Sequence, residues 1–202
     1  MMQFLFRRIA TFAWCAASVL ALPGSAATLN VELRDSNGAP LVDGVVYALP
    51  RSGKVPAFQE ASATIDQIQR QFVPLVSVIR TGTAVHFPNK DNIRHQVYSF
   101  SPAKTFELKL YSGRPAKPVI FDKAGLVVLG CNIHDQMIAY VQVVDTPWFG
   151  KTDASGMAHL ENLPDGEYEV HAWHYRQAAK GDFVRILRSG SPLLKIRLDT
   201  KP

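Results

Sequence analysis

Short stretches of alternating apolar and polar residues recur about every ten positions, separated by turn residues such as Gly, Pro, Asn and Asp. This period of two is typical of β-strands with one buried face. The best helical candidate, the polar stretch 61–71, has no continuous apolar stripe and is compatible with extended chain. The sequence therefore predicts an all-β fold built from β-sandwiches. The predicted strands are 28–33, 44–49, 73–80, 83–87, 96–100, 106–111, 125–129, 138–144 and 167–173.

The N-terminal 27 residues have the order of a secretory signal peptide. Arg7 and Arg8 precede an apolar run that ends before Pro23, and small residues follow. The run is shorter than the roughly 20 apolar residues of a spanning helix. We expect cleavage after Ala26 or Ala27 and export of the remaining chain, about 175 residues, to the periplasm.

The chain has 22 Lys and Arg residues against 17 Asp and Glu, a net charge of +5. Seven of these cations, but only two Asp, lie from Arg176 onward, so the basic character is concentrated in this tail. We interpret the tail as a solvated face, with an acidic protein partner or a membrane surface as alternatives. Export and the lack of a recognition motif argue against binding of nucleic acid.

Cys131 would be the one cysteine left after cleavage, because Cys15 lies in the predicted signal peptide. Cysteines in an oxidising compartment usually pair, so an unpaired thiol needs a reason. A buried small hydrophobe is one reading. However, His134 and Met137 follow Cys131 at intervals of three residues, so a thiolate, an imidazole and a thioether share one loop. This ligand set is typical of copper sites.

A further ligand should come from a separate strand, because one short loop could not hold two imidazoles and a thiolate in a plane around a metal. His95 is the candidate, since it stands at the start of a predicted strand, 36 residues before Cys131. The string FPNKDNIRH leads into it.

Residues 60–145 resemble the cupredoxins, or blue copper proteins, through the F-x-N-x-D-x-x-x-H approach to the first histidine and the closing Cys-x-x-His-x-x-Met loop. The short loop is most similar to amicyanin-like members, and both strings together resemble exported methylamine utilization proteins. The resemblance implies a Greek-key β-sandwich with one type 1 copper ion. It makes His95, Cys131 and His134 the equatorial ligands and Met137 the long axial ligand.

The resemblance also implies a function as a one-electron carrier between periplasmic redox proteins, not an enzyme. A dehydrogenase or a c-type cytochrome would be a transient partner, and methylamine utilization the setting. The alternatives are a copper-binding or copper-delivery protein whose metal is cargo, and a degenerate cupredoxin that binds a partner without metal. Zinc is a further alternative, although Met is a poor zinc ligand. One departure is Gln96, where many cupredoxins have an Asn that ties the ligand loops together.

The flanks carry D-x-x-G-x-P-L at 35–41, T-D-x-x-G at 152–156 and L-P-x-G-x-Y at 163–168. These pieces resemble the front and back of the carboxypeptidase regulatory-like, transthyretin-like sandwich. Because about 100 residues separate them, we expect the cupredoxin domain, 60–145, to be inserted into a sandwich formed by 28–59 and 146–202. Three serial pieces are the alternative.

Four other residues with metal-binding or acid–base chemistry are interpreted as structural. His171 and His174 would face opposite sides of a strand, which disfavours a shared metal. Asp91 and Asp135 are interpreted as solvated turn residues, because neither a nucleophile nor an oxyanion framework accompanies them.

Overall fold

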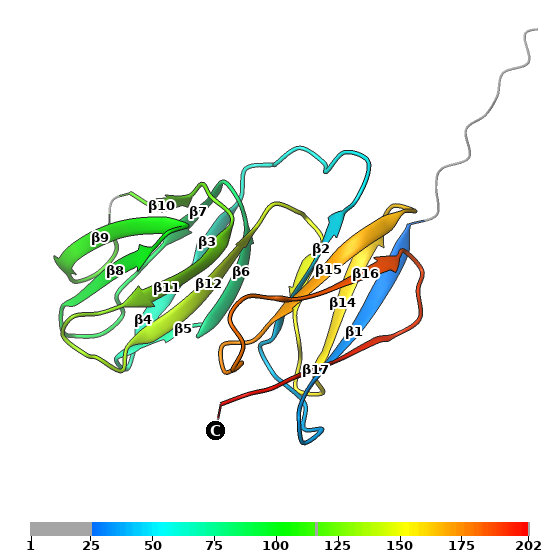
Figure 1. The fold of residues 1–202 in the computed structure, drawn as a ribbon. Helices are drawn as coiled ribbons and strands as arrows, with labels where there is room; N and C mark the ends of the chain where they lie inside the picture. Colours follow the sequence, from blue (N-terminus) through cyan, green and yellow to red (C-terminus); the bar gives the residue numbers. More distant parts are fainter. Residues whose placement is uncertain (1–25, 116, 202) are drawn as a thin grey trace, which may run out of the picture.

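The computed structural model describes residues 26–115 and 117–201 (Figure 1). The predicted signal peptide lies outside the described residues, apart from its last two. Within the described ranges the chain forms seventeen strands and no helix, so the predicted all-β class is confirmed. Those ranges accordingly contain no helix long and apolar enough to cross a membrane.

The two flanks of the sequence pair with each other in two sheets. One sheet has the order β14-β1-β17 and the other β13-β2-β15-β16. The pairing of β1 with β17 is parallel, and that of β2 with β15 is antiparallel. The bounds of these strands are β1 (Ala27–Asp35), β2 (Val45–Pro50), β13 (Phe149–Lys151), β14 (Met157–Leu163), β15 (Glu167–Trp173), β16 (Phe183–Arg188) and β17 (Leu194–Leu198).

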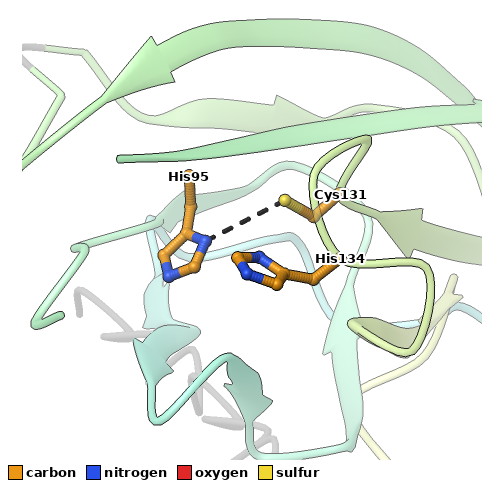
Figure 2. A group of neighbouring side chains, drawn as sticks. All are labelled: His95, Cys131 and His134. Atoms are coloured by element: carbon orange, nitrogen blue, oxygen red, sulfur yellow. Dashed lines mark hydrogen bonds between the residues drawn. The ribbon is translucent and has the colours of Figure 1, made fainter. Parts of the chain in front are cut away.

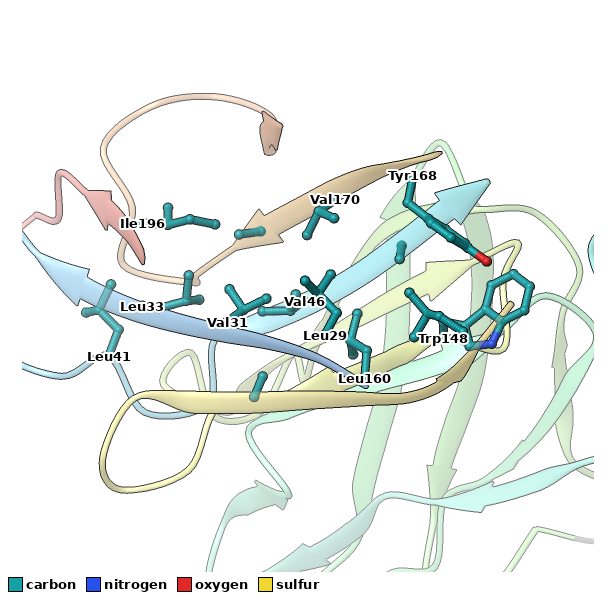
Figure 3. Packing of buried hydrophobic residues seen from close by; sticks show 14 of the residues in the cluster. Leu29, Val31, Leu33, Leu41, Val46, Trp148, Leu160, Tyr168, Val170 and Ile196 are labelled. Atoms are coloured by element: carbon teal, nitrogen blue, oxygen red, sulfur yellow. The ribbon is translucent and has the colours of Figure 1, made fainter. Parts of the chain in front are cut away.

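Alternate residues of these strands face the core of the flanking sandwich (Figure 3). Leu29, Val31 and Leu33 of β1 are buried at a period of two, as the sequence pattern predicts. The turn before β14 requires a glycine: Gly156 has φ +80°, and a Cβ there would lie 2.5 Å from the backbone oxygen of Leu33. The turn therefore packs directly against β1.

The central part of the chain forms the second sandwich. A five-stranded sheet has the order β6-β12-β11-β8-β9, a three-stranded sheet has the order β10-β7-β3, and β4 and β5 form a hairpin. The bounds of these strands are β3 (Ser62–Thr64), β4 (Asp66–Ile68), β5 (Gln71–Val73), β6 (Val76–Arg80), β7 (Thr83–His86), β8 (His95–Ser101), β9 (Lys104–Tyr111), β10 (Val119–Phe121), β11 (Gly125–Gly130) and β12 (Ile138–Val144).

The core of the central sandwich is separate from that of the flanks. Phe87, Phe121 and Leu129 are among its fully buried side chains, and Cys131 and Met137 belong to the same cluster. The predicted loop residues therefore lie at the edge of a hydrophobic core, where packing restricts their movement.

A third buried cluster joins the two sandwiches. Tyr140 of β12 lies against Trp173 of β15, with ring centroids 5.6 Å apart. Lys151 of β13 donates a hydrogen bond to the carbonyl oxygen of Val76 in β6, at 2.9 Å. The buried members of this cluster are Val45, Tyr47, Val76, Val144 and Trp173.

Strands before residue 51 thus pair directly with strands after residue 148, although the central sandwich separates them in the sequence. This pairing supports the insertion of one domain into another, which stays our proposal for the domain division. The stretch 61–71 is not helical: it contains β3, β4, the turn at 69–70 and the first residue of β5. The basic tail contributes β16 and β17, whose cationic side chains Arg185, Arg188, Lys195 and Arg197 are exposed, as expected of a solvated face.

Candidate metal centre

The sheet register brings His95 beside the loop that follows β11. Strands β8 and β11 are antiparallel neighbours, with Tyr98 opposite Gly130. Moving back along β8 from Tyr98 to His95 therefore runs in the same direction as moving forward from Gly130 into the loop. His95 is the first residue of β8 and is fully buried. The predicted position of His95 at the start of a strand is confirmed, while its role as a ligand stays a prediction.

The loop between β11 and β12 carries the other three predicted ligands. Its last turn is closed by the amide of Met137, which donates to the carbonyl oxygen of His134 at 2.8 Å. Cys131 and Met137 are buried, whereas His134 is partly exposed. The thiol and thioether therefore face the core, while the histidine lies at the molecular surface.

Figure 2 shows His95, Cys131 and His134 converging from the two segments. One potential ligand atom from each residue lies within 4.8 Å of the other two. The Nδ1 atom of His95 is 4.0 Å from the Sγ atom of Cys131, and the two imidazole rings have centroids 5.2 Å apart. Metal bonds to nitrogen and sulfur are about 2.0–2.3 Å long, so donors that share one ion stand roughly 3.5–4 Å apart. The three residues fit a common metal with small adjustments.

The hydrogen bonding of His134 is also compatible with a metal site. Its Nδ1 atom is buried and has no hydrogen-bond partner. A buried polar atom without a partner is costly, and native structures rarely keep one without a reason. A metal ion beside Cys131 would satisfy this lone pair. Both ring nitrogens of His171 also lack a hydrogen-bond partner, so it is the convergence with His95 and Cys131 that makes His134 a candidate ligand.

Gly130 shapes the strand that delivers the thiol. A Cβ atom at this position would lie 2.7 Å from both Cζ and Oη of Tyr98, so the tyrosine ring packs directly over the glycine. Any larger residue would displace Tyr98 or shift the strand that leads into Cys131. The glycine thus helps to fix the backbone next to the sulfur.

The interpretation of Asp91 as a solvated turn residue is wrong. Its side chain is 13% exposed, and its Oδ2 atom lies 2.8 Å from Nε2 of His95. Burial alone would raise the pKa of Asp91, but hydrogen bonds from the Arg70 amide, His95 and the Gln69 amide outweigh it, and the pKa lies below its usual range. The spacing of four residues between Asp91 and His95 was the available sequence signal.

The expected departure at Gln96 is visible in its contacts. The Gln96 side chain is buried, and its Nε2 atom donates to Oε1 of Glu107 in β9 at 2.6 Å. It therefore points along the sheet toward β9. The role of an amide that ties two ligand loops together is not supported for this residue.

The other histidine pair does not form a metal site. His174 is buried and its Nε2 atom lies 3.0 Å from the carbonyl oxygen of Val42, whereas His171 stacks on Tyr47. Among the residues that the structure describes, His95, Cys131 and His134 are the one group of at least three His, Cys, Asp or Glu residues that could hold an ion. The structural interpretation of His171 and His174 agrees with these contacts.

Neither a protein-family model nor a curated protein matches the sequence. Among solved structures, a copper-containing nitrite reductase from Thermus scotoductus SA-01 is 23% identical over 48% of this chain, with a TM-score of 0.39. The chain covers 25% of that enzyme's length. A purple cupredoxin from Nitrosopumilus maritimus is 21% identical over 42% of this chain and 100% of its own, with a TM-score of 0.36.

A reduced variant of amicyanin is 19% identical over 48% of this chain and 99% of its own, with a TM-score of 0.37. These similarities are partial and of low identity. The candidate metal centre is therefore defined by the positions of His95, Cys131 and His134 in this chain.

Proposed function

We propose that the protein is a cupredoxin-type copper protein that carries single electrons between redox proteins. The observation that carries this proposal is the convergence of His95, Cys131 and His134, in which the Nδ1 atom of His134 is buried without a hydrogen-bond partner. A thiolate with two imidazoles, beside a Met, is the donor set of electron-transfer copper sites. We propose that Met137 would be a further ligand to the copper, because it closes the same loop and is buried in the same cluster as Cys131.

Copper bound here would supply one-electron chemistry by alternating between Cu(I) and Cu(II). The residues of this chain would keep the geometry nearly constant during that change. His95 is buried at the start of β8, and Cys131 directly follows β11 in the same sheet. Because packing in a protein core resists displacement, the reorganisation that slows electron transfer should be small.

The surface beside His134 suits brief contact with a partner. Ile133, which precedes the partly exposed His134, and Ile138, which follows the same loop, are 48% and 40% exposed. An apolar patch of this kind is suited to a small and transient interface. We propose a dehydrogenase or a c-type cytochrome as partner, with export to the periplasm and methylamine utilization as the setting. In this proposal the protein itself is not an enzyme.

An absorption and electron paramagnetic resonance spectrum of the copper-loaded protein tests the proposal. We expect one copper per chain, an intense visible band from thiolate-to-Cu(II) charge transfer, a narrow copper hyperfine coupling and a reversible potential. Cys131→Ser should abolish the band, because the thiolate is its source.

Asp135→Ala is a suitable control, since it alters an exposed side chain of the same loop. A band that survives in the Cys131→Ser variant would exclude the proposed site. A protein that binds only Cu(I) and releases it readily would indicate delivery of copper as cargo.

A further inference from the structure

We propose that Asp91 is a positioning residue, which holds the ring proton of His95 on Nε2 and the lone pair of Nδ1 toward Cys131. The importance of this arrangement for copper rests on the proposed function. The arrangement itself concerns only contacts within the chain.

The two ring nitrogens of His95 have different neighbours. Nε2 lies 2.8 Å from Oδ2 of Asp91, while Nδ1 lies 4.0 Å from Sγ of Cys131. The ring is fully buried, so bulk solvent does not reach either nitrogen. In a neutral imidazole one nitrogen donates and the other accepts, so the partner of Nε2 decides the state of Nδ1.

Asp91 is held as an acceptor by the turn between β4 and β5. The amide of Gln69 donates to Oδ1 at 2.7 Å, and the amide of Arg70 donates to Oδ2 at 2.9 Å. Gln69 and Arg70 have φ values of 52° and 60°, a left-handed conformation that is uncommon for residues other than glycine. This conformation turns two successive amides toward one carboxylate, as in other backbone anion sites.

The backbone around Asp91 is fixed as well. Its amide donates to Oδ1 of Asn89 at 3.0 Å, and Nδ2 of Asn89 donates to the carbonyl oxygens of Ile93 and Tyr111 at 2.8 and 2.9 Å. The carboxylate is thus connected both to the β4–β5 turn and to the end of β9. Rotation of His95 away from Cys131 would break the one hydrogen bond that this buried ring makes to Asp91.

Asp91 therefore prepares a ligand before any metal arrives. With the proton on Nε2, Nδ1 is free to bind, and the ring already faces the thiol. Carboxylates that orient metal-bound histidines in this way typically contribute 10- to 100-fold to metal affinity.

Proton and nitrogen NMR of the metal-free protein tests the arrangement without copper. We expect the wild-type protein to give a slowly exchanging proton signal on Nε2 of His95 and an unprotonated Nδ1. In Asp91→Ala the Nε2 proton should exchange too fast to be observed. Asp135→Ala is the control, because it removes a carboxylate from an exposed position of the ligand loop.

Copper titration provides the second measurement. We expect Asp91→Ala to weaken binding by about 10- to 100-fold, and Asp135→Ala to weaken it by less than about twofold. A wild-type spectrum with the proton on Nδ1 would overturn the proposal even if Asp91→Ala fails to fold. Unchanged proton exchange and copper affinity in a folded Asp91→Ala protein would also overturn it.

The outcomes also separate this proposal from the proposed function. If the wild-type protein has the expected proton on Nε2 but does not bind copper, the proposed function is contradicted, while the role of Asp91 in orienting His95 still holds. A blue copper protein with the proton of metal-free His95 on Nδ1 would support the function and contradict the role of Asp91.

Discussion

Each sandwich contains a histidine that is largely shielded from solvent and lies near a carboxylate, but the two surroundings differ in kind. His95 in the central sandwich has Asp91 on one side and Cys131 on the other. His171 in the flanking sandwich stacks on Tyr47, with ring centroids 4.6 Å apart. Its Nδ1 atom is 3.4 Å from Oδ2 of Asp182.

The difference lies in where the lone pairs meet. Around His95, atoms from three residues converge on one point. Around His171, the carboxylates of Asp182 and Glu169 approach opposite nitrogens, so no common point exists for an ion. The hydroxyl of Tyr47 also donates to Asp182 and occupies one of its acceptor positions. Burial of a histidine beside acids is therefore not sufficient for a metal site, because the donor atoms must face one another.

The strongest test of this comparison is the same substitution in both places. His95→Gln should abolish the visible copper band, because the imidazole ligand from β8 is lost. His171→Gln should leave the copper stoichiometry and the spectrum unchanged. Copper analysis and absorption spectra of both variants measure this, and a blue protein in the His95→Gln variant would contradict the assignment.

One buried leucine from each core allows the packing of the two sandwiches to be compared. Leu129→Ala and Leu160→Ala should each lower the free energy of unfolding by about 2–5 kcal/mol, because both side chains are buried. Leu129 is two residues before Cys131, so its loss should also alter the copper spectrum. Denaturant unfolding and absorption spectra measure both effects. An altered copper spectrum in folded Leu160→Ala would mean that the two cores are coupled more tightly than their separate clusters indicate.

Two tyrosines should give the smallest effect, a loss of stability in alkali. Burial raises the pKa of Tyr111 to about 12, and burial with the bond to Asp182 raises the pKa of Tyr47 further. Unfolded tyrosines ionise near pH 10. Their contribution is therefore complete below about pH 10 and is lost as the pH rises above it, up to about pH 12 for Tyr111.

Measuring the free energy of unfolding from about pH 8 to 11 tests whether stability falls as the pH rises. Tyr111→Phe, near the candidate centre, and Tyr47→Phe, beside His171, should each make the decline less steep. An ultraviolet titration in which both tyrosines of the folded protein ionise near pH 10 would contradict the expected shifts.

Local sequence patterns were sufficient for the main strands and for the candidate ligands. The bounds of β12 and β15 match the predicted 138–144 and 167–173, because a period of two is set by the geometry of a strand. The loop from Cys131 to Met137 could be singled out because its donor residues are close in sequence. His95 was predicted from its place at the start of a strand.

Other features were decided only by tertiary structure. Strands β3, β4, β5 and β10 have three residues each, too few for a clear period, and pairing with distant strands defines them. The parallel contact of β17 with β1 joins residues more than 150 positions apart. Asp91 orients His95 because a turn from another hairpin supplies two amides, a contact between segments that no local pattern encodes. The sequence determined which chemical groups are present, and the fold decided which of them meet.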